Sequence, residues 1–469
     1  MGLFKGILLT TGASLVSVAA ASAADLPVRK AAPVEYVKVC DAYGAGFFYI
    51  PGTDTCLKVG GYVRVDYDYR PQRDSTGFQG AGVSVFTPTG GVAQPGIPVV
   101  GGGRFSRNLA DYTTNGFYNR GTVQLDARTQ TAWGTVQTVM ALRMETGSGV
   151  MERTATGASL EAAYVRFAGF TFGQAAQPFA FASGWAFNTG WAQGWPNGVR
   201  QLAYTHVFGG GFSATIAATD ARNYNGVTSS AIATYPSSFE RAGVVWVGNL
   251  RYDQSWGSAQ IMGAYQKGGT AAVTNQVVIG NALDSLTGTN ESGWAVGAGV
   301  AINLPMLASG DRLELQAVYA DRLANLLGDG GINTPSAAAY GSNPLGGPTV
   351  NFANGKGYSL LAQIRHYWTP TIRSQLYVSY TAREMHAESD GNVVAARRGA
   401  KGNAMGIGHA LIWSPVRNFD LGLEVTYLRA SWNAAAVRTA AGGYSAYPLA
   451  NGSLKEDTVI GKVRVQRNF

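Results

Sequence analysis

Apolar and polar residues alternate along many short stretches of this chain, most clearly in its last twelve residues, 458–469. Successive side chains of a β-strand point to opposite faces. Val463 and Val465 therefore share one face of this segment, while Lys462 and Arg464 share the other. One face suits lipid and the other suits water, which is typical of a strand in a transmembrane β-barrel.

The same alternation recurs from residue 59 to the end, and the spacers between the segments are short and long in strict turn. Transmembrane barrels have short periplasmic turns, longer extracellular loops and strands of roughly 10 residues. The pattern predicts an all-β fold, a 16-stranded antiparallel transmembrane β-barrel over residues 59–469. The predicted strands are 59–70, 119–130, 134–146, 158–168, 170–174, 199–209, 212–223, 241–252, 257–267, 293–303, 312–322, 356–367, 372–386, 401–412, 418–430 and 456–469.

Parity within these strands places charges of both signs on one face. A soluble sandwich could show the same alternation, with its charged face toward solvent, so alternation alone does not separate the two architectures. In a barrel this face would line a water-filled lumen. The predicted pore-lining residues are Arg64, Asp66, Asp126, Arg128, Arg143, Glu145, Arg166, Glu314, Arg365, Glu424, Lys462 and Arg464.

Aromatic residues on the apolar face gather at the strand ends, which favours the barrel because interfacial girdles of Trp and Tyr are typical of membrane proteins. The alternative is the aromatic core of a sandwich. At ends that lead into long loops lie Tyr67, Tyr265, Tyr319, Tyr380 and Tyr427, and at ends that lead into short turns or the terminus lie Phe208, Tyr252, Trp368 and Phe469.

Residues 1–23 have the features of a secretory signal peptide, with Lys5 before an apolar run and the small residues 21–23 as the cleavage site. The mature chain would start at Ala24. Beyond it we find no stretch of about 18 apolar residues, which a membrane-spanning helix needs. With 46% hydrophobic and only 14% charged residues, the chain is too apolar to be disordered. It is therefore a soluble secreted protein or a barrel of the bacterial outer membrane.

The two cysteines, Cys40 and Cys56, lie in a segment that precedes the predicted barrel, residues 24–58. Since an exported chain meets an oxidising periplasm, we expect one disulfide that closes this segment on the periplasmic side. Two free thiols are the alternative. On the chain-entropy estimate so short a closed loop would stabilise the fold by about 3 kcal/mol.

The stretch from Cys40 to Tyr67 resembles the alphaproteobacterial outer-membrane porin family of the Brucella and rhizobial type. Both cysteines, the Phe-Tyr-Ile-Pro-Gly-Thr run at 48–53, the Gly-Gly-Tyr-Val-Arg run at 60–64 and the terminal Phe469 carry the likeness. The resemblance implies a sixteen-stranded barrel that assembles as a homotrimer. It also implies that ions and small hydrophilic solutes diffuse passively through the barrel across the outer membrane. It also implies that the third long loop, about 175–198, folds inward and narrows the pore, and that Phe469 is the terminal assembly signal.

This third loop departs from the porin pattern, in which acidic loop residues oppose arginines of the wall. No acidic residue occurs between Glu161 and Asp220. We therefore expect weak anion preference, unless lumen carboxylates cancel the wall arginines. The aromatic residues could stack on sugar rings and make the channel substrate-preferring, or they could simply pack the loop against the wall. They are Phe179, Phe181, Trp185, Phe187, Trp191 and Trp195.

Other functional classes find less support. The four histidines, at 206, 366, 386 and 409, lack metal-ligand spacing, and no Gly-x-Ser-x-Gly motif occurs, so we expect no enzyme, metal or cofactor. A barrel hydrolase and an adhesive barrel without conductance stay open as alternatives. The export signal and the dispersed arginines argue against nucleic acid as a partner. Outer-membrane lipid is the expected environment, and Arg397, Arg398 and Lys401 could bind lipopolysaccharide phosphates or form a solvated cluster.

Overall fold

A computed structural model gives the structure of the chain and divides it into two units, Met1–Lys38 and Val39–Phe469. The predicted export signal lies outside the described residues, as do Trp185, Trp191, Trp195, Arg397 and Arg398. The structure describes residues 39–71, 113–148, 158–182, 187, 198–220, 243–267, 277–279, 282–284, 292–327, 355–385, 401–433 and 453–469.

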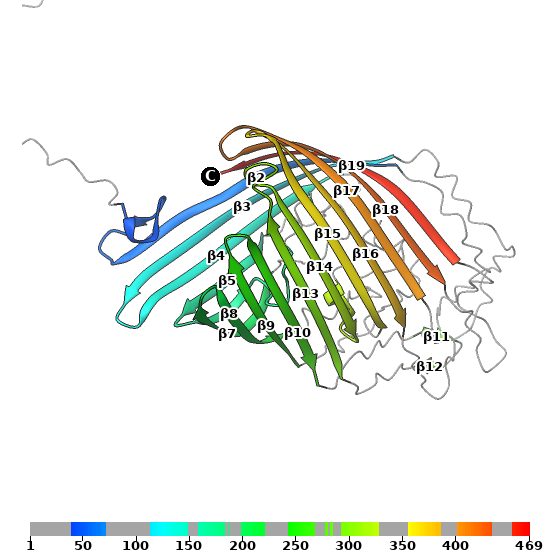
Figure 1. The fold of residues 1–469 in the computed structure, drawn as a ribbon, viewed down its shortest axis with the longest axis horizontal. Coiled ribbons are helices and arrows are strands. Elements are labelled where there is room, and N and C mark those ends of the chain that lie inside the picture. The colour runs from blue at the N-terminus through cyan, green and yellow to red at the C-terminus, as the bar shows by residue number, and fades with distance from the viewer. Residues whose placement is uncertain are drawn as a thin grey trace, which may run out of the picture. The chain divides into compact units, whose positions relative to one another are not determined.

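Sixteen antiparallel strands form a closed ring within the second unit, as the alternation predicted (Figure 1). Each strand pairs with the next along the chain, and the last, β19, pairs with the first of the ring, β2. A closed ring leaves no edge strand open to lipid. The ring consists of β2 Thr55–Pro71, β3 Thr113–Thr131, β4 Gly134–Gly147, β5 Ala158–Phe167, β6 Phe170–Ala175, β7 Val199–Gly209, β8 Phe212–Asp220, β9 Val244–Gln254, β10 Gly257–Gln266, β13 Gly293–Asn303, β14 Arg312–Asp321, β15 Gly355–Thr369, β16 Ile372–Met385, β17 Lys401–Val416, β18 Phe419–Asn433 and β19 Ser453–Asn468.

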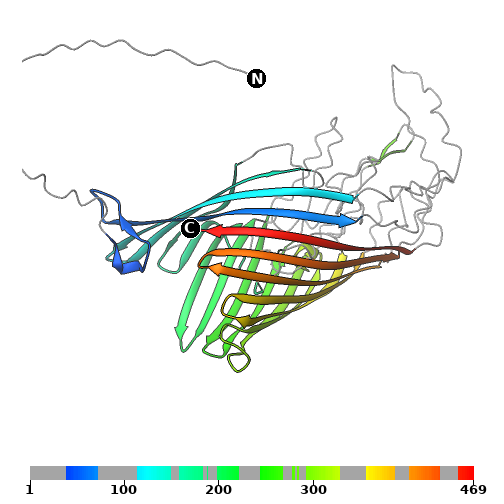
Figure 2. The same ribbon diagram turned by 90° about the horizontal axis from the view of Figure 1, so that it is seen from above.

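The seam between β19 and β2 closes the ring, and these two strands lie side by side in Figure 2. Val465 pairs with Val65, which keeps apolar residues next to each other across the seam. At its end Phe469 N donates to Gly61 O at 3.0 Å, and Gly61 N donates to Phe469 O at 3.2 Å. The ladder therefore continues to the terminal residue itself.

Strand β2 begins at Thr55, four residues before the predicted start. Its first residues pair with β3 on one side but extend beyond the end of β19 on the other. Strand β1, Phe48–Tyr49, covers part of this free edge by pairing with Leu57 and Cys56. The predicted disulfide between Cys40 and Cys56 is confirmed. An uncovered strand edge would offer unpaired N–H and C=O groups to other chains, and the disulfide-closed segment protects it.

Besides β1, the described residues form other short elements outside the ring of strands. A separate two-stranded pair, β11 Val277–Ile279 and β12 Ala282–Asp284, falls between β10 and β13, and the short 3₁₀ helices η1 Asp41–Tyr43 and η4 Ala324–Leu327 precede β2 and follow β14. The pattern of alternation predicted none of these short elements. In the part of the chain that the structure describes, no helix is long and apolar enough to cross a membrane.

The outward face of the ring is apolar, with exposed aromatic rings near both ends of the strands. At the ends that lead to long connections lie Trp246 and Tyr265, and at the ends with short turns lie Phe208 and Trp368, which is 63% exposed. Two such bands agree with the predicted girdles. His409 has the same parity in β17 as the exposed Ile407 and Leu411 and therefore shares their outward face.

Candidate pore constriction

The segment that follows β6 crosses the enclosed side of the ring. Ala182 N donates to Gln316 Oε1 of β14 at 2.8 Å, and Phe187 N donates to Glu424 Oε2 of β18 at 2.5 Å. The segment starts between β6 and β7, so within the closed ring it reaches these strands only through the interior. The structure thus places residues 176–182 and 187 inside the barrel, where the predicted third loop was expected.

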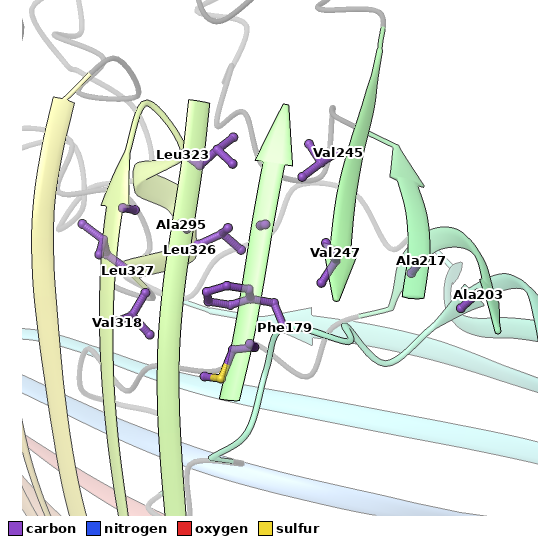
Figure 3. Packing of buried hydrophobic residues seen from close by; sticks show 13 residues of the cluster. Phe179, Ala203, Ala217, Val245, Val247, Ala295, Val318, Leu323, Leu326 and Leu327 are labelled. Atoms are coloured by element: carbon purple, nitrogen blue, oxygen red, sulfur yellow. The ribbon is translucent and has the colours of Figure 1, made fainter. Parts of the chain in front are cut away.

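Phe179 begins this inner path within an apolar cluster on the interior wall (Figure 3). Its ring, 3% exposed, lies among side chains of β9, β13 and β14, such as Val247 and Val318, and Leu327 of η4 belongs to the same cluster. Asn249 Nδ2 donates to Pro178 O at 2.7 Å and fixes the backbone beside it. This part of the wall carries small and apolar residues, and the loop shields them from water by packing on them.

Phe181 rests on the wall where β13 has a glycine. A Cβ added at Gly299 would lie 2.2 Å from Phe181 Cδ1, so only glycine leaves room for the ring. The guanidinium of Arg251 lies 5.5 Å from the centre of the same ring, within the range of a cation–π interaction. Gln260 and Gln316 bond to the neighbouring backbone at Ala180 O and Ala182 N.

Phe187 is held by its ring and by both of its peptide groups. A Cβ at Gly422 would lie 2.2 Å from Phe187 Cζ, so this ring too sits over a glycine. The Arg464 guanidinium lies 4.3 Å from the ring centre, and its Nη2 donates to Phe187 O at 3.2 Å. The Phe187 N–H donates to the fully buried carboxylate of Glu424. The third loop is therefore fixed at a second point, on the far wall from Phe179.

Arg464 also joins the loop to a buried network of charges at the seam. Its Nε and Nη2 donate to the two carboxylate oxygens of Asp66, both at 2.7 Å. Lys462 Nζ lies 3.0 Å from Asp68 and 3.7 Å from Asp66. A bidentate arginine–carboxylate pair fixes direction as well as distance, so it orients the guanidinium toward the loop.

The other predicted carboxylates of the enclosed face also have partners. Asp126 accepts from Arg128 at 2.7 Å, and Glu314 accepts from Gln363 at 2.6 Å. Glu145 lies 2.7 Å from Arg120, an arginine that was not predicted. Arg120 occupies the same parity as Asp126 in β3, so extending the alternation toward the start of that strand would have found it.

The structure brings some predicted residues together and leaves others apart. Arg64, Asp66, Glu424, Lys462 and Arg464 gather on adjacent strands around the seam, on β18, β19 and β2. Arg143 joins Glu145 at 2.9 Å two strands away. Arg166 on β5, and Glu314 with Arg365 on β14 and β15, lie on other parts of the ring.

Arg64 and Arg166 make no ion pair or hydrogen bond with a carboxylate among the described residues, whereas the structure gives one to Arg120, Arg128, Arg143 and Arg464 of the same face. Arg64 Nε donates to the amide oxygen of Gln466 at 2.8 Å, and its guanidinium lies over the Tyr62 ring. Arg166 lies over the ring of Tyr164 at 4.7 Å. The groups in direct contact with these two guanidinium groups are therefore aromatic rings and, for Arg64, an amide.

Two of the histidines each lie beside one polar side chain, while His386 lies outside the described residues. His366 Nδ1 lies 2.5 Å from the buried Asp311, and His409 Nε2 lies 3.1 Å from Ser374 Oγ. Within the described ranges no group of three or more His, Cys, Asp or Glu residues could hold a metal ion.

Comparison with known proteins places this geometry in a family. The chain matches the family described as the porin subfamily over residues 25–460. Porin Omp2b of Brucella suis and Porin Omp2b of Brucella abortus are each 32% identical to it over 276 residues, which cover 56% of this chain and 65% of each relative. The matched part therefore spans just under two thirds of these curated relatives.

The fold is shared with a solved outer-membrane channel. The outer membrane channel DcaP of Acinetobacter baumannii superposes with a TM-score of 0.54 at 15% identity, over 90% of this chain and 99% of that chain. At this level of identity the likeness concerns the fold alone.

Proposed function

The chain belongs to the porin subfamily, and from this premise we propose that it forms a water-filled channel for passive diffusion of ions and small hydrophilic solutes. It is an outer-membrane β-barrel, with the apolar outward face toward lipid. One observation carries the proposal: the closed ring encloses a charged and polar face, and an inner loop crosses that enclosed space. The family is one of channels, which supports the expectation that the chain is not an enzyme.

Such a channel works without energy input or a bound intermediate. Polar residues on the enclosed face keep water in the lumen, and the inner loop narrows the cross-section at the height of Phe187 and Phe181. Solutes then pass according to size and charge. Because field lines concentrate in a narrow passage with low-dielectric walls, the charges nearest the loop weigh more than the net charge of +8.

Reconstitution of the purified protein into planar bilayers tests the proposal directly. We expect stepwise currents whose size rises with salt concentration. Insertion without any current would refute the channel function and favour the adhesive alternative.

We propose weak anion preference for this channel. The described part of the inner loop is uncharged, and the carboxylates Asp66, Asp126, Glu145 and Glu314 each lie within 3 Å of a cationic or amide donor. Arg64 and Arg166 form no ion pair with a carboxylate among the described residues. Reversal potentials in a salt gradient test the sign, and clear cation selectivity would contradict it.

The aromatic loop residues that the structure describes support wall packing rather than sugar binding. Phe179 and Phe187 are only 3% and 7% exposed, so their faces contact the wall and not a passing solute. We therefore propose a general diffusion channel over a sugar-preferring one. Current block by maltooligosaccharides that saturates at low concentration would reverse this choice.

A homotrimer is the proposed assembly, on the strength of family membership. Currents that close in three equal steps would support it. Single steps from a particle with the mass of one chain would contradict it.

A further inference from the structure

Two arginines stand directly opposite each other on neighbouring strands beside the inner loop. Arg64 of β2 pairs in register with Arg120 of β3, on the enclosed face. Side chains at such positions have Cβ atoms about 5 Å apart, and like charges there repel each other. Arg464, on the next strand, pairs in register with Asp66, two residues along β2 from Arg64, and so adds a third positive group beside this pair.

The neighbouring carboxylates do not balance this pair fully. Asp66 is engaged by Arg464 in a bidentate pair. Glu145 lies 2.7 Å from Arg120 but also 2.9 Å from Arg143, so two arginines share it. Within the part of the chain that the structure describes, Arg64 keeps its charge without a carboxylate in contact.

Two tyrosines hold the arginine pair in place. The Arg64 guanidinium lies 4.9 Å from the centre of the Tyr62 ring, and the Arg120 guanidinium lies 5.4 Å from that of Tyr118. Arg120 also donates to Tyr118 Oη at 2.7 Å and, through Nη1, to Tyr62 Oη at 3.4 Å. Tyr62 therefore contacts both guanidinium groups, so they are oriented before any solute arrives, which lowers the entropic cost of binding.

The donors that remain on Arg64 point to the class of ligand. An arginine carries five N–H donors, and among the described residues only the Nε–H of Arg64 has a hydrogen-bond acceptor, the Gln466 amide. The two terminal nitrogens present a planar fork, which matches two oxygen atoms of a carboxylate or phosphate better than a spherical halide ion.

We propose that Arg64 and Arg120, supported by Tyr62 and Tyr118, form a saturable binding site for small oxyanions, the carboxylate or phosphate groups of passing solutes. The site lies beside the Arg464–Phe187 contact and so next to the inner loop that is proposed to narrow the lumen. An oxyanion bound there relieves the repulsion between the two arginines and slows the passage of chloride. The site rests on the proposed channel function and adds chemical selectivity to it.

The test is block of chloride current across planar bilayers that contain the full-length protein. Inorganic phosphate or acetate is added to potassium chloride, and potassium bromide of equal ionic strength serves as the halide control. We expect the chloride current to fall and level off with phosphate or acetate but not with bromide. Phosphate alone would place the ligands among phosphoryl compounds, and acetate alone among carboxylates; either supports the site.

Arg64→Gln should raise the half-blocking concentration about tenfold, because a charge-assisted hydrogen bond is replaced by a neutral one. Arg166→Gln is the matched control, since Arg166 is a second arginine of this face that lies over a tyrosine without a carboxylate. It removes the same charge from the lumen but not from the site. We expect it to shift the reversal potential while leaving the half-blocking concentration within about twofold.

Three results would overturn the site. They are the absence of saturation in the unmodified channel, a half-blocking concentration that Arg64→Gln leaves unchanged, and equal loss of block in both variants, which would show a general field effect. Channel currents in plain potassium chloride confirm that each variant has folded. A protein that gives no current at all refutes the proposed function and the site together, whereas a conducting channel without saturation refutes the site alone.

Discussion

The contact between Phe187 and Gly422 allows a sharp test of how the inner loop is held. Gly422→Ala places a Cβ at 2.2 Å from Phe187 Cζ, whereas two carbon atoms need about 3.5 Å. The ring must therefore move by more than about 1 Å. Backbone of β18 cannot yield easily, since it pairs on both sides with β17 and β19.

The energy at stake follows from what the displaced ring loses. Burial of a phenylalanine side chain contributes about 1.5 to 3 kcal/mol. The contact with Arg464, at 4.3 Å, adds about 0.5 to 2 kcal/mol. If Gly422→Ala removes about 2 kcal/mol of this sum, the ratio of seated to released loop falls roughly 30-fold.

Single-channel recording measures the outcome. We expect Gly422→Ala to increase the noise of the open channel and to raise its mean conductance, because a released loop narrows the lumen less. Gly121→Ala is the matched control, since a Cβ there meets no atom within 4 Å. A variant at Gly422 with the conductance and noise of the unmodified channel would refute the idea that this contact sets the pore.

Three further predictions concern stability. Asp66→Asn leaves the Arg464 guanidinium buried without its bidentate partner and should cost about 3 to 5 kcal/mol in the free energy of unfolding, measured by urea titration in detergent; a change below 1 kcal/mol would contradict it. Gly61→Ala puts a Cβ at 2.0 Å from Thr122 O and should lower the yield of heat-modifiable barrel on gels. An unchanged yield would show that the seam accommodates the methyl group and would contradict this prediction. Cys40→Ser opens the disulfide and should destabilise the fold by about 3 kcal/mol with conductance unchanged; equal unfolding curves would argue against this role.

Most of the ring could be predicted from the sequence because a strand with one face toward lipid and one toward water must alternate. That signal is local, and it places strands such as 199–209 and 293–303 with the bounds that the structure gives. It fails at the start of β2, where Thr55 to Lys58 pair with β3 beyond the end of β19 and no longer separate lipid from water. The disulfide and β1 protect that edge, and neither leaves a period-2 signal.

The constriction could be predicted only in part. Its charged wall residues follow from parity, and the inward path of the loop followed from the family resemblance. The positions at which its aromatic rings contact the wall could not be predicted, because Phe181 packs on Gly299 and Phe187 packs on Gly422 across long separations in sequence. A glycine in a strand has several meanings, and only the folded ring shows which glycine lies under an aromatic side chain.

The way the loop is fixed bears directly on the charge of the pore. A loop without carboxylates cannot pair with wall arginines through its own side chains, so here the wall supplies both signs. Glu424 accepts from the Phe187 N–H, and Arg464 donates to the Phe187 carbonyl and covers its ring. These two wall charges, and Asp66 with them, are therefore engaged behind the loop rather than exposed to solutes. The positive groups that remain outside these interactions include Arg64, which lies opposite Arg120, and this is the structural basis of the proposed anion preference.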